Sequence, residues 1–391
     1  MPWKVVKPME QKLLFIAYHL RKVMSFSDLC QRYGISRKTG YKWVDRYHRL
    51  GMEGLQDQSR RPRCHPLQTP YVVRKAIVEL RKNFPDPPGP KKIRALLRGK
   101  YPQWSIPSNT TIYNILRQEE LIRPQRRRKR VPAGQQPFAP TRHPNDLWSV
   151  DFKGQFKTRD GSWCYPLTVM DHESRYLLAC CNQSGTRFKP TRKVFESLFR
   201  IYGLPARIRS DNGVPFASNS PGGLSQLAIW WIRLGIYPER IAPGKPQQNG
   251  QHERMHRTLK AWAARPPKAN PEEQQRAFST FCQQYNYQRP HESLGQKTPA
   301  ALYSCSPRAM PEKLPELTYP SHYKVNLVHH SGIIAHQGHR VYVAGLLKGE
   351  HVGLEEIDND LWEIYFGPVR LGRVNMSQVK KAHNDYLRLE V

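Results

Sequence analysis

Hydrophobic and polar positions follow a helical period at the start of the chain. Residues 9–23 carry apolar side chains at helical spacing, residues 27–33 form a shorter stretch of the same kind, and another begins after Ser36. Serine is favoured at helix N-caps, and Gly34 marks the turn between the last two stretches. The pattern predicts a helix-turn-helix unit over residues 1–58, with a plain three-helix bundle as the alternative.

A second helical unit is predicted over residues 66–124. Residues 70–83 and 91–99 have the helical period, and a third helix begins after Ser108, again a favoured N-cap. The two units are not copies of each other, so they are not internal repeats. The arginine- and proline-rich stretch 125–144 is predicted to be a linker.

The pattern changes to alternating strand and helix from residue 145. Strand-like alternation at 147–152, two further strands and a sequence of helices and short strands predict an α/β core over residues 145–305. Four strand-like stretches with turns about every ten residues predict a small β-barrel-like domain over residues 312–391. The expected fold is therefore multidomain, with all-α units, an α/β core and a β-rich end.

The net charge of the chain indicates the kind of binding partner. The formal net charge is +32 at pH 7. Residues 1–133 hold 30 Lys and Arg against 9 Asp and Glu, whereas residues 301–391 hold 10 against 10. A basic surface attracts polyanions, because each neutralised phosphate releases condensed counterions. Nucleic acid is therefore the expected partner, with an anionic membrane surface as the alternative.

Hydropathy and cysteine spacing disfavour several other classes of protein. No apolar run approaches the roughly 18 residues of a membrane-spanning helix, and the first residues lack the apolar segment of a signal peptide. The seven cysteines are scattered and form no CxxC pair. This spacing disfavours a disulfide framework or a zinc finger and indicates a reducing compartment. We expect no membrane association and no small-molecule substrate.

Candidate DNA contacts lie on the two predicted recognition helices. In the first unit the outward-facing side chains are Arg37, Lys38, Tyr41 and Lys42. In the second unit they are the short polar side chains Asn109, Thr110, Thr111 and Asn114. A solvated basic face is the alternative for the first set. Gly40 lies within the first recognition helix at a cost of about 1 kcal/mol relative to alanine, and we expect it to permit close packing on the preceding helix.

Three carboxylates are placed for metal chemistry. Asp151 lies in the first core strand, Asp211 directly follows a later strand, and Glu253 lies on a predicted helix. The first and fourth strands of such a sheet lie side by side, so the carboxylates meet and require a cation between them. Oxygen ligands of this kind suit Mg²⁺ or Mn²⁺. The alternative for a single strand aspartate is a turn cap, which is our interpretation of Asp171.

The segments around these acids resemble a known family. The motifs WSVDF, RSDNGVPF, GKPQQNGQHERMHRTLK and YNYQRPHESLGQKTPA are similar to those of retroviral integrases and bacterial insertion-sequence transposases, which share a ribonuclease H-like fold. The resemblance implies that Asp151, Asp211 and Glu253 hold two metal ions. One ion would activate the attacking oxygen and the other would stabilise the leaving 3′ oxygen in phosphoryl transfer.

The resemblance also suggests protein–DNA contacts next to the phosphodiester bond that would be cleaved. Basic and polar side chains around the third acid are candidates for DNA binding: Lys245, Asn249, Arg254, Arg257 and Lys260. A solvated helix face is the alternative. Two departures from the family pattern are visible. Forty-one residues lie between Asp211 and Glu253, with residues 219–223 as an apparent inserted loop, and helix-turn-helix units replace the zinc module of retroviral integrases.

These observations favour a DDE transposase of a bacterial insertion sequence. It would bind the terminal inverted repeats, nick the 3′ ends and join them to target DNA, as a dimer or larger multimer in the bacterial cytoplasm and nucleoid. The alternatives are the integrase of a retroelement, a DNA-binding regulator with an inactive core, and a metal-dependent nuclease without joining activity.

Overall fold

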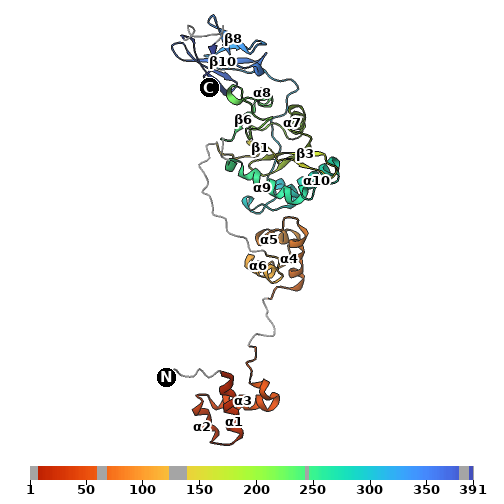
Figure 1. Ribbon diagram of the computed structural model, residues 1–391, viewed down its shortest axis with the longest axis vertical. Coiled ribbons are helices and arrows are strands. Elements are labelled where there is room, and N and C mark those ends of the chain that lie inside the picture. Colours follow the sequence, from red (N-terminus) through yellow and green to blue (C-terminus); the bar gives the residue numbers. More distant parts are fainter. Residues whose placement is uncertain (1–7, 60–67, 123–138, 243–245, 378–386, 391) are drawn as a thin grey trace. The chain divides into compact units, whose positions relative to one another are not determined.

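The computed structural model describes residues 8–59, 68–122, 139–242, 246–377 and 387–390 (Figure 1). The chain divides into two compact units, Met1–Gln68 and Thr69–Val391. None of the helices in these ranges has the length and apolar content needed to cross a membrane.

The first unit is a helix-turn-helix. Its elements are α1 (Pro8–Leu20), α2 (Phe26–Arg32), α3 (Arg37–Leu50) and the 3₁₀ helix η1 (Gly51–Leu55). Ser36 caps α3 as expected, because its side chain accepts a hydrogen bond from the Thr39 backbone N–H at 3.2 Å. Gly34 in the turn has a φ of +62°, a backbone conformation that glycine adopts without strain.

Close packing explains the glycine within α3. A Cβ atom added at Gly40 would lie 2.7 Å from Cys30 Sγ and 3.0 Å from a ring carbon of Phe26. Both residues belong to α2, and Gly40 itself is buried. The prediction that Gly40 lets α3 approach the preceding helix is confirmed.

The second unit begins with three helices, α4 (Tyr71–Asn83), α5 (Pro90–Lys100) and α6 (Asn109–Gln118). They pack around an apolar cluster that includes Ile77, Ile93 and Ile112. Ser108 caps α6 as predicted, since its hydroxyl oxygen accepts from the Thr111 N–H at 3.1 Å.

A six-stranded mixed sheet forms the centre of the second unit. The strands run in the order β2-β3-β1-β5-β6, and β4 pairs with β3. Pairing is antiparallel among β1, β3 and β4 and parallel from β1 through β5 to β6. Their bounds are Leu147–Phe152, Phe156–Lys157, Trp163–Asp171, Leu177–Gln183, Arg207–Ser210 and Tyr237–Arg240 for β1 to β6.

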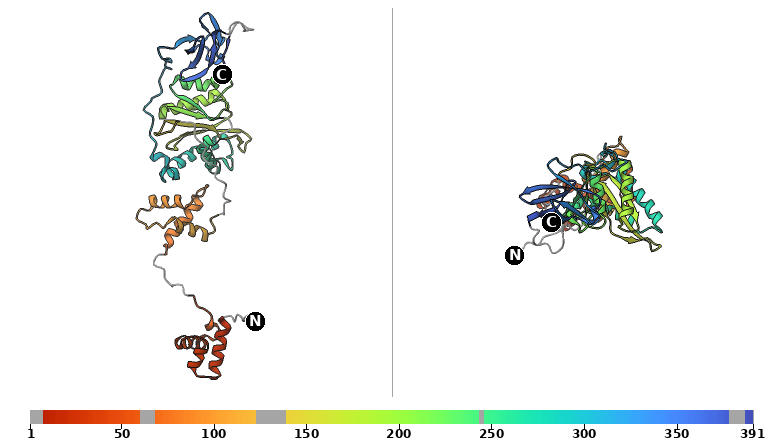
Figure 2. Two further views of the ribbon diagram at one scale, coloured as in Figure 1. Left: turned by 90° about the vertical axis from the view of Figure 1, so that its left-hand side faces the viewer. Right: turned by 90° about the horizontal axis from the view of Figure 1, so that it is seen from above.

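Helices cover both faces of this sheet, as Figures 1 and 2 show. On one face α7 (Phe188–Tyr202) and α8 (Gln226–Arg233) enclose a core containing Trp148, Trp230 and Trp231. The two adjacent tryptophans are buried and fill this core. On the other face lie α9 (Gly250–Leu259) and α10 (Pro271–Gln283). Single turns of π-helix follow them at Lys260–Ala264 and Gln284–Gln288.

The C-terminal part is β-rich, as predicted, but its described strands do not close into one barrel. A four-stranded sheet has the order β12-β11-β10-β7, and a three-stranded sheet has the order β13-β9-β8. The strands are β7 (Lys324–Leu327), β8 (Ile333–His336), β9 (His339–Tyr342), β10 (His351–Asp358), β11 (Leu361–Phe366), β12 (Val369–Asn375) and β13 (Leu387–Arg388). Apolar side chains such as Ile334, Val341 and Ile364 belong to one buried cluster contributed by both sheets.

Candidate active site

The parallel pair β1 and β5 brings two of the predicted acids together. In the register of this pair Trp148 lies opposite Ile208 and Ser149 opposite Arg209. Continuing the register by two residues places Asp151 beside Asp211. Asp211 follows the last residue of β5, and its Oδ1 accepts a hydrogen bond from the Gly213 N–H at 3.1 Å. The expectation that the two strands are neighbours is therefore confirmed.

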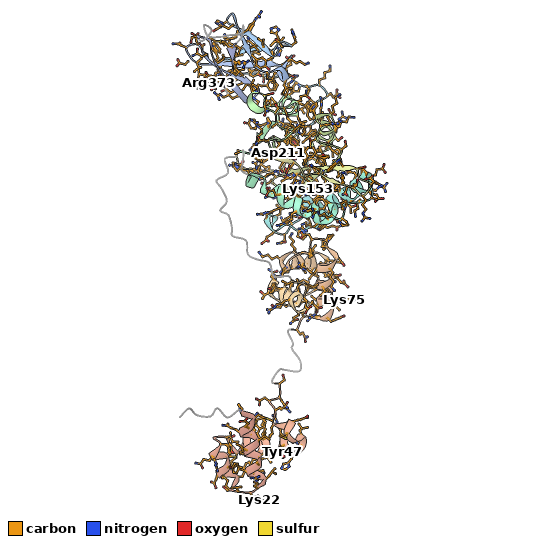
Figure 3. The ribbon with its side chains drawn as sticks, viewed as in Figure 1. Lys22, Tyr47, Lys75, Lys153, Asp211 and Arg373 are labelled. Atoms are coloured by element: carbon orange, nitrogen blue, oxygen red, sulfur yellow. The ribbon has the colours of Figure 1, made fainter. Side chains whose placement is uncertain are left out.

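The third acid approaches from the helix that crosses β1. Glu253 lies in the first turn of α9, where its carboxylate is exposed. α9 contacts β1 directly. Figure 3 labels Asp211, which directly follows β5, and Lys153, which directly follows the neighbouring strand β1.

The electrostatics of Asp151 reflect crowding by like charges. Its pKa is raised from the usual 3.8 to about 7, first by burial and then by the negative charges of Asp211 and Glu253. A hydrogen bond from the Phe152 backbone opposes this shift. Like charges that share a site disfavour ionisation unless a cation lies between them. The three acids are therefore close enough for their charges to interact.

The donor chemistry fits a hard divalent cation, because all three side chains offer only carboxylate oxygens. Within the described ranges, no three acidic, histidine or cysteine side chains already surround a single point. Asp151 lies within β1 and Asp211 directly follows β5, whereas Glu253 is exposed on α9. The three carboxylates therefore fit a hard divalent cation in their donor chemistry, and their charges interact.

Basic side chains surround the acids. Burial and the charges of Lys260 and Arg265 lower the pKa of Lys153, whose other charged neighbour is Asp151. Arg254 and Arg257 are exposed on α9, the helix that carries Glu253. Such a rim attracts a phosphate backbone to the carboxylates.

The two other core residues predicted to contact DNA are placed differently. Asn249 is only 8% exposed, immediately before α9. Lys245 lies outside the described residues.

The predicted contacts of the helix-turn-helix unit lie on the open side of α3. Arg37, Lys38, Tyr41 and Lys42 are all exposed. Tyr41 nevertheless stacks on Phe26, with ring centroids 4.2 Å apart.

On α6, Thr110 and Asn114 are exposed, whereas Asn109 and Thr111 are half-buried. The Thr111 hydroxyl lies 3.0 Å from the hydroxyl of the cap residue Ser108, so it takes part in the helix cap.

A polar cluster under the acids was missed by sequence reasoning. Two histidines of α9 are buried, His252 completely and His256 to 9% exposure. Both rings lie 2.7 Å from the Thr168 hydroxyl through Nε2, and His252 Nδ1 lies 2.9 Å from Ser149 Oγ. Burial lowers the pKa of His252 to about 3 and that of His256 to about 2, so both rings are neutral. Their spacing of four residues on one helix face was the available signal.

Asp171 caps a turn, as expected, but it is also completely buried. Its carboxylate accepts hydrogen bonds from the Asn145 N–H at 2.7 Å and from the Ser174 N–H and hydroxyl at 2.8 and 2.6 Å. A residue with three buried hydrogen bonds holds the fold together. Asp160, in an exposed turn, is therefore the better comparison residue for studies of the acids.

Known families match both parts of the chain. Residues 141–246 and 234–299 each match a family described as Integrase core domain. Residues 11–63 match the family described as Helix-turn-helix domain, and residues 39–116 match Homeodomain-like domain. The predicted combination of helix-turn-helix units with an integrase-type core is confirmed.

Individual proteins match more locally. The Gag-Pol polyprotein of Baboon endogenous virus (strain M7) is 34% identical over 131 residues, 34% of this chain and 7% of that protein. An uncharacterized 39.2 kDa protein of insertion element IS476 from Xanthomonas euvesicatoria is 26% identical over 219 residues, 54% of this chain and 59% of that protein. The chain thus spans less than two thirds of either relative.

A solved structure of the HTLV-2 integrase catalytic core domain in complex with magnesium is 16% identical. It covers 41% of this chain and 97% of its own, with a TM-score of 0.33, too low to carry an argument. The family matches define the central domain as an integrase core. The chain is similar to bacterial insertion-element proteins, and two of its segments match the integrase core family.

Proposed function

We propose that this protein is a DDE transposase that nicks the 3′ ends of a mobile element and joins them to target DNA. The observation that carries the proposal is that β1, β5 and α9 bring Asp151, Asp211 and Glu253 into one region. Burial there, and then the charges of Asp211 and Glu253, raise the pKa of Asp151 to about 7. Acids that repel each other in this way lower the stability of the fold unless a bound cation offsets the repulsion. A cation site beside a basic rim is suited to phosphodiester chemistry.

The three acids would hold two Mg²⁺ or Mn²⁺ ions. When bound, such ions neutralise the charge that develops on the attacking and leaving oxygens of a phosphoryl transfer. Asp151 and Asp211 would supply ligands from the rigid sheet, and Glu253 would supply the ligand from the helix. The rim formed by Lys153, Lys260 and Arg265 would hold the scissile strand against these acids.

The helix-turn-helix unit and the second helical unit would recognise the DNA sequence of the element ends. Arg37, Lys38, Tyr41 and Lys42 on α3 and Asn109, Thr110, Thr111 and Asn114 on α6 are the proposed contacts to the terminal inverted repeats. Lys245, Asn249, Arg254, Arg257 and Lys260 are the proposed contacts beside the cut. Joining two ends requires them to be held together, so we propose a dimer or larger multimer on double-stranded DNA, associated with the bacterial nucleoid.

The test is end cleavage and strand transfer on labelled terminal-repeat oligonucleotides in Mg²⁺ and in Mn²⁺. Asp211→Asn and Glu253→Gln keep size and shape but remove a ligand charge, so both reactions should fall by several orders of magnitude. Both variants should still bind the repeat. Asp160→Asn is the matched control and should react at the wild-type rate.

The outcomes separate the alternatives. Cleavage without joined product indicates a nuclease, and repeat binding without any reaction indicates a regulator with an inactive core. Wild-type rates in Glu253→Gln contradict its assignment as the third ligand. Joining that requires the ends of a reverse-transcribed element, and not a bacterial insertion element, would favour a retroelement integrase.

A further inference from the structure

The buried polar cluster beneath the proposed ligands has a definite hydrogen-bond arrangement. We name Ser149, Thr168, His252 and His256 the α9 seam. Thr168 Oγ1 is at its centre, 3.0 Å from the Asp151 carbonyl oxygen and 2.7 Å from Nε2 of each histidine. The seam therefore links β1, β3 and α9 through one hydroxyl group.

The hydrogens of the seam can be assigned by elimination. A hydroxyl has one hydrogen and two lone pairs. If Thr168 donates to the Asp151 carbonyl, its lone pairs must accept N–H from both His252 and His256, so each ring carries its hydrogen on Nε2. His252 Nδ1 is then an acceptor, and Ser149 Oγ donates to it at 2.9 Å. This arrangement satisfies all four contacts, and the longer contact of Ser149 Oγ with the Met170 carbonyl oxygen, at 3.3 Å, then has no hydrogen.

The α9 seam lies next to two of the proposed ligands, Asp151 on β1 and Glu253 on α9. Thr168 is the cross-strand partner of Asp151 in the β1–β3 register. Glu253 directly follows His252 on α9 and precedes His256 by three residues. His256 Nδ1 lies 3.8 Å from Asp151 Oδ2, but it carries no hydrogen in this arrangement, so the contact is not a hydrogen bond. A shift or rotation of α9 would break the seam and move Glu253 together with it.

Apolar contacts alone would hold the helix less specifically. Met255 and Leu259 on α9 are buried in the apolar cluster on this face of the sheet. Apolar packing is not directional, whereas a buried hydrogen bond is lost when its geometry changes, and the unpaired groups then destabilise the shifted state. Directional bonds at this position therefore select one placement of α9.

We propose that the α9 seam is the positioning element that aligns Glu253 with Asp151 and Asp211. This inference rests on the proposed function, since it requires that the three acids share a metal site. The seam residues do not touch substrate in this role. They act through the position of α9, as outer partners that orient metal ligands do in other sites.

The test compares Thr168→Val with Thr168→Ser in the full-length protein. Valine has nearly the shape of threonine but no hydroxyl, whereas serine keeps the hydroxyl. Mn²⁺ binding is measured by electron paramagnetic resonance of the free ion, and strand transfer is measured against Mn²⁺ concentration. Thr168→Val should raise the Mn²⁺ concentration for half-maximal binding roughly 10- to 100-fold, and Thr168→Ser should remain near wild type.

This measurement distinguishes positioning from a loss of folded protein. A smaller folded fraction in reversible equilibrium would also raise the half-maximal concentration, in inverse proportion to that fraction. The midpoints are therefore compared where circular dichroism without Mn²⁺ shows both variants to be folded. An unchanged midpoint in folded Thr168→Val then overturns the proposal. If Thr168→Val does not fold, His256→Leu and His256→Gln replace the pair, because glutamine retains a donor where Nε2 stood. Equal midpoints in that pair would overturn it as well.

The two proposals fail in different ways. A wild-type protein that binds Mn²⁺ but neither cuts nor joins DNA contradicts the transposase proposal, and the Mn²⁺ midpoints still decide the role of the seam. A wild-type protein that binds no Mn²⁺ contradicts both. Active wild-type protein together with an unchanged Thr168→Val midpoint contradicts the seam alone.

Discussion

Removal of one negative charge should stabilise the metal-free core. In Asp151→Asn the amide has nearly the size of the carboxylate but does not repel Asp211 and Glu253. The wild-type carboxylate is 23% exposed and has a pKa of about 7, so at pH 8 it is charged in a site that disfavours the charge. The segments around the acids should therefore unfold locally less often in Asp151→Asn than in wild type, at pH 8 with all divalent ions removed by a chelator.

The size and sign of the effect follow from the pKa. The folded carboxyl keeps its proton up to about pH 7, whereas the unfolded one loses it near 3.8. The folded state binds more protons in this window, so stability falls as the pH rises from about 4 to about 7. The full difference corresponds to at most about 4 kcal/mol, or about a thousandfold in an opening equilibrium.

Hydrogen exchange measured by mass spectrometry on the intact chain suits this prediction, because it reports on each segment separately. Peptides that cover β1 and β5 should exchange more slowly in Asp151→Asn than in wild type at pH 8. At pH 4 the difference should disappear, since Asp151 is then protonated. Mg²⁺ should slow exchange in the wild type and have little effect on the variant.

The matched control is Asp160→Asn. Asp160 is exposed and accepts a hydrogen bond from the Ser162 N–H at 3.0 Å, which an asparagine oxygen can also accept. Exchange in β1 and β5 should be unchanged. Equal exchange of wild type and Asp151→Asn at pH 8 without metal, or a difference that grows toward pH 4, would refute the charge-crowding argument.

Two further predictions concern the folded state. Gly40→Ala should destabilise the first unit, because the added Cβ would lie 2.7 Å from Cys30 Sγ and overpacking of this kind costs about 1–3 kcal/mol. This cost exceeds the gain of about 1 kcal/mol in helix propensity that alanine brings. Faster hydrogen exchange of the α2 and α3 amides would show the effect, and slower exchange would contradict it. Asp171→Asn should lower the stability of the core by about 1–3 kcal/mol, because an amide cannot accept all three hydrogen bonds that the carboxylate accepts. Urea unfolding followed by tryptophan fluorescence measures this loss, and an unchanged unfolding midpoint would contradict it.

Much of the core could be predicted because its signals are local. Alternation marked β1 and β3, and the order of strands and helices implied that β1 lies beside β5. The caps Ser36 and Ser108 fixed helix starts within one residue, because N-capping depends on a side chain and the next turn of backbone.

The C-terminal sheets show where such reasoning stops. β8 and β9 are joined by a two-residue turn at Gln337 and Gly338, both with positive φ. Glutamine is unusual at the first position of such a turn, so the hairpin was missed. The parallel pairing of β13 with β9 joins segments more than forty residues apart, and no local pattern specifies it.

The histidines of the α9 seam illustrate a second limit. His252 and His256 lie among Arg254, Arg257 and Lys260, so the composition of α9 suggested a solvated face. Burial of a helix face depends on which face the sheet covers, and that is decided by tertiary packing. The same limit applies to Asn249, whose burial before α9 the sequence did not indicate.

The long interval before Glu253 has a structural explanation. Residues 219–223, which the resemblance marks as an apparent insertion, include a 3₁₀ turn at Pro221–Gly223, and the bridge between Ala217 and Leu224 closes this loop at its base. The loop therefore starts and ends at nearly the same place. Backbone hydrogen bonds of the sheet set the position of Asp151 and Asp211, whereas Glu253 depends on contacts between α9 and the sheet. The chain can thus vary in length between the acids, provided that side-chain contacts such as the α9 seam return the helix to one position.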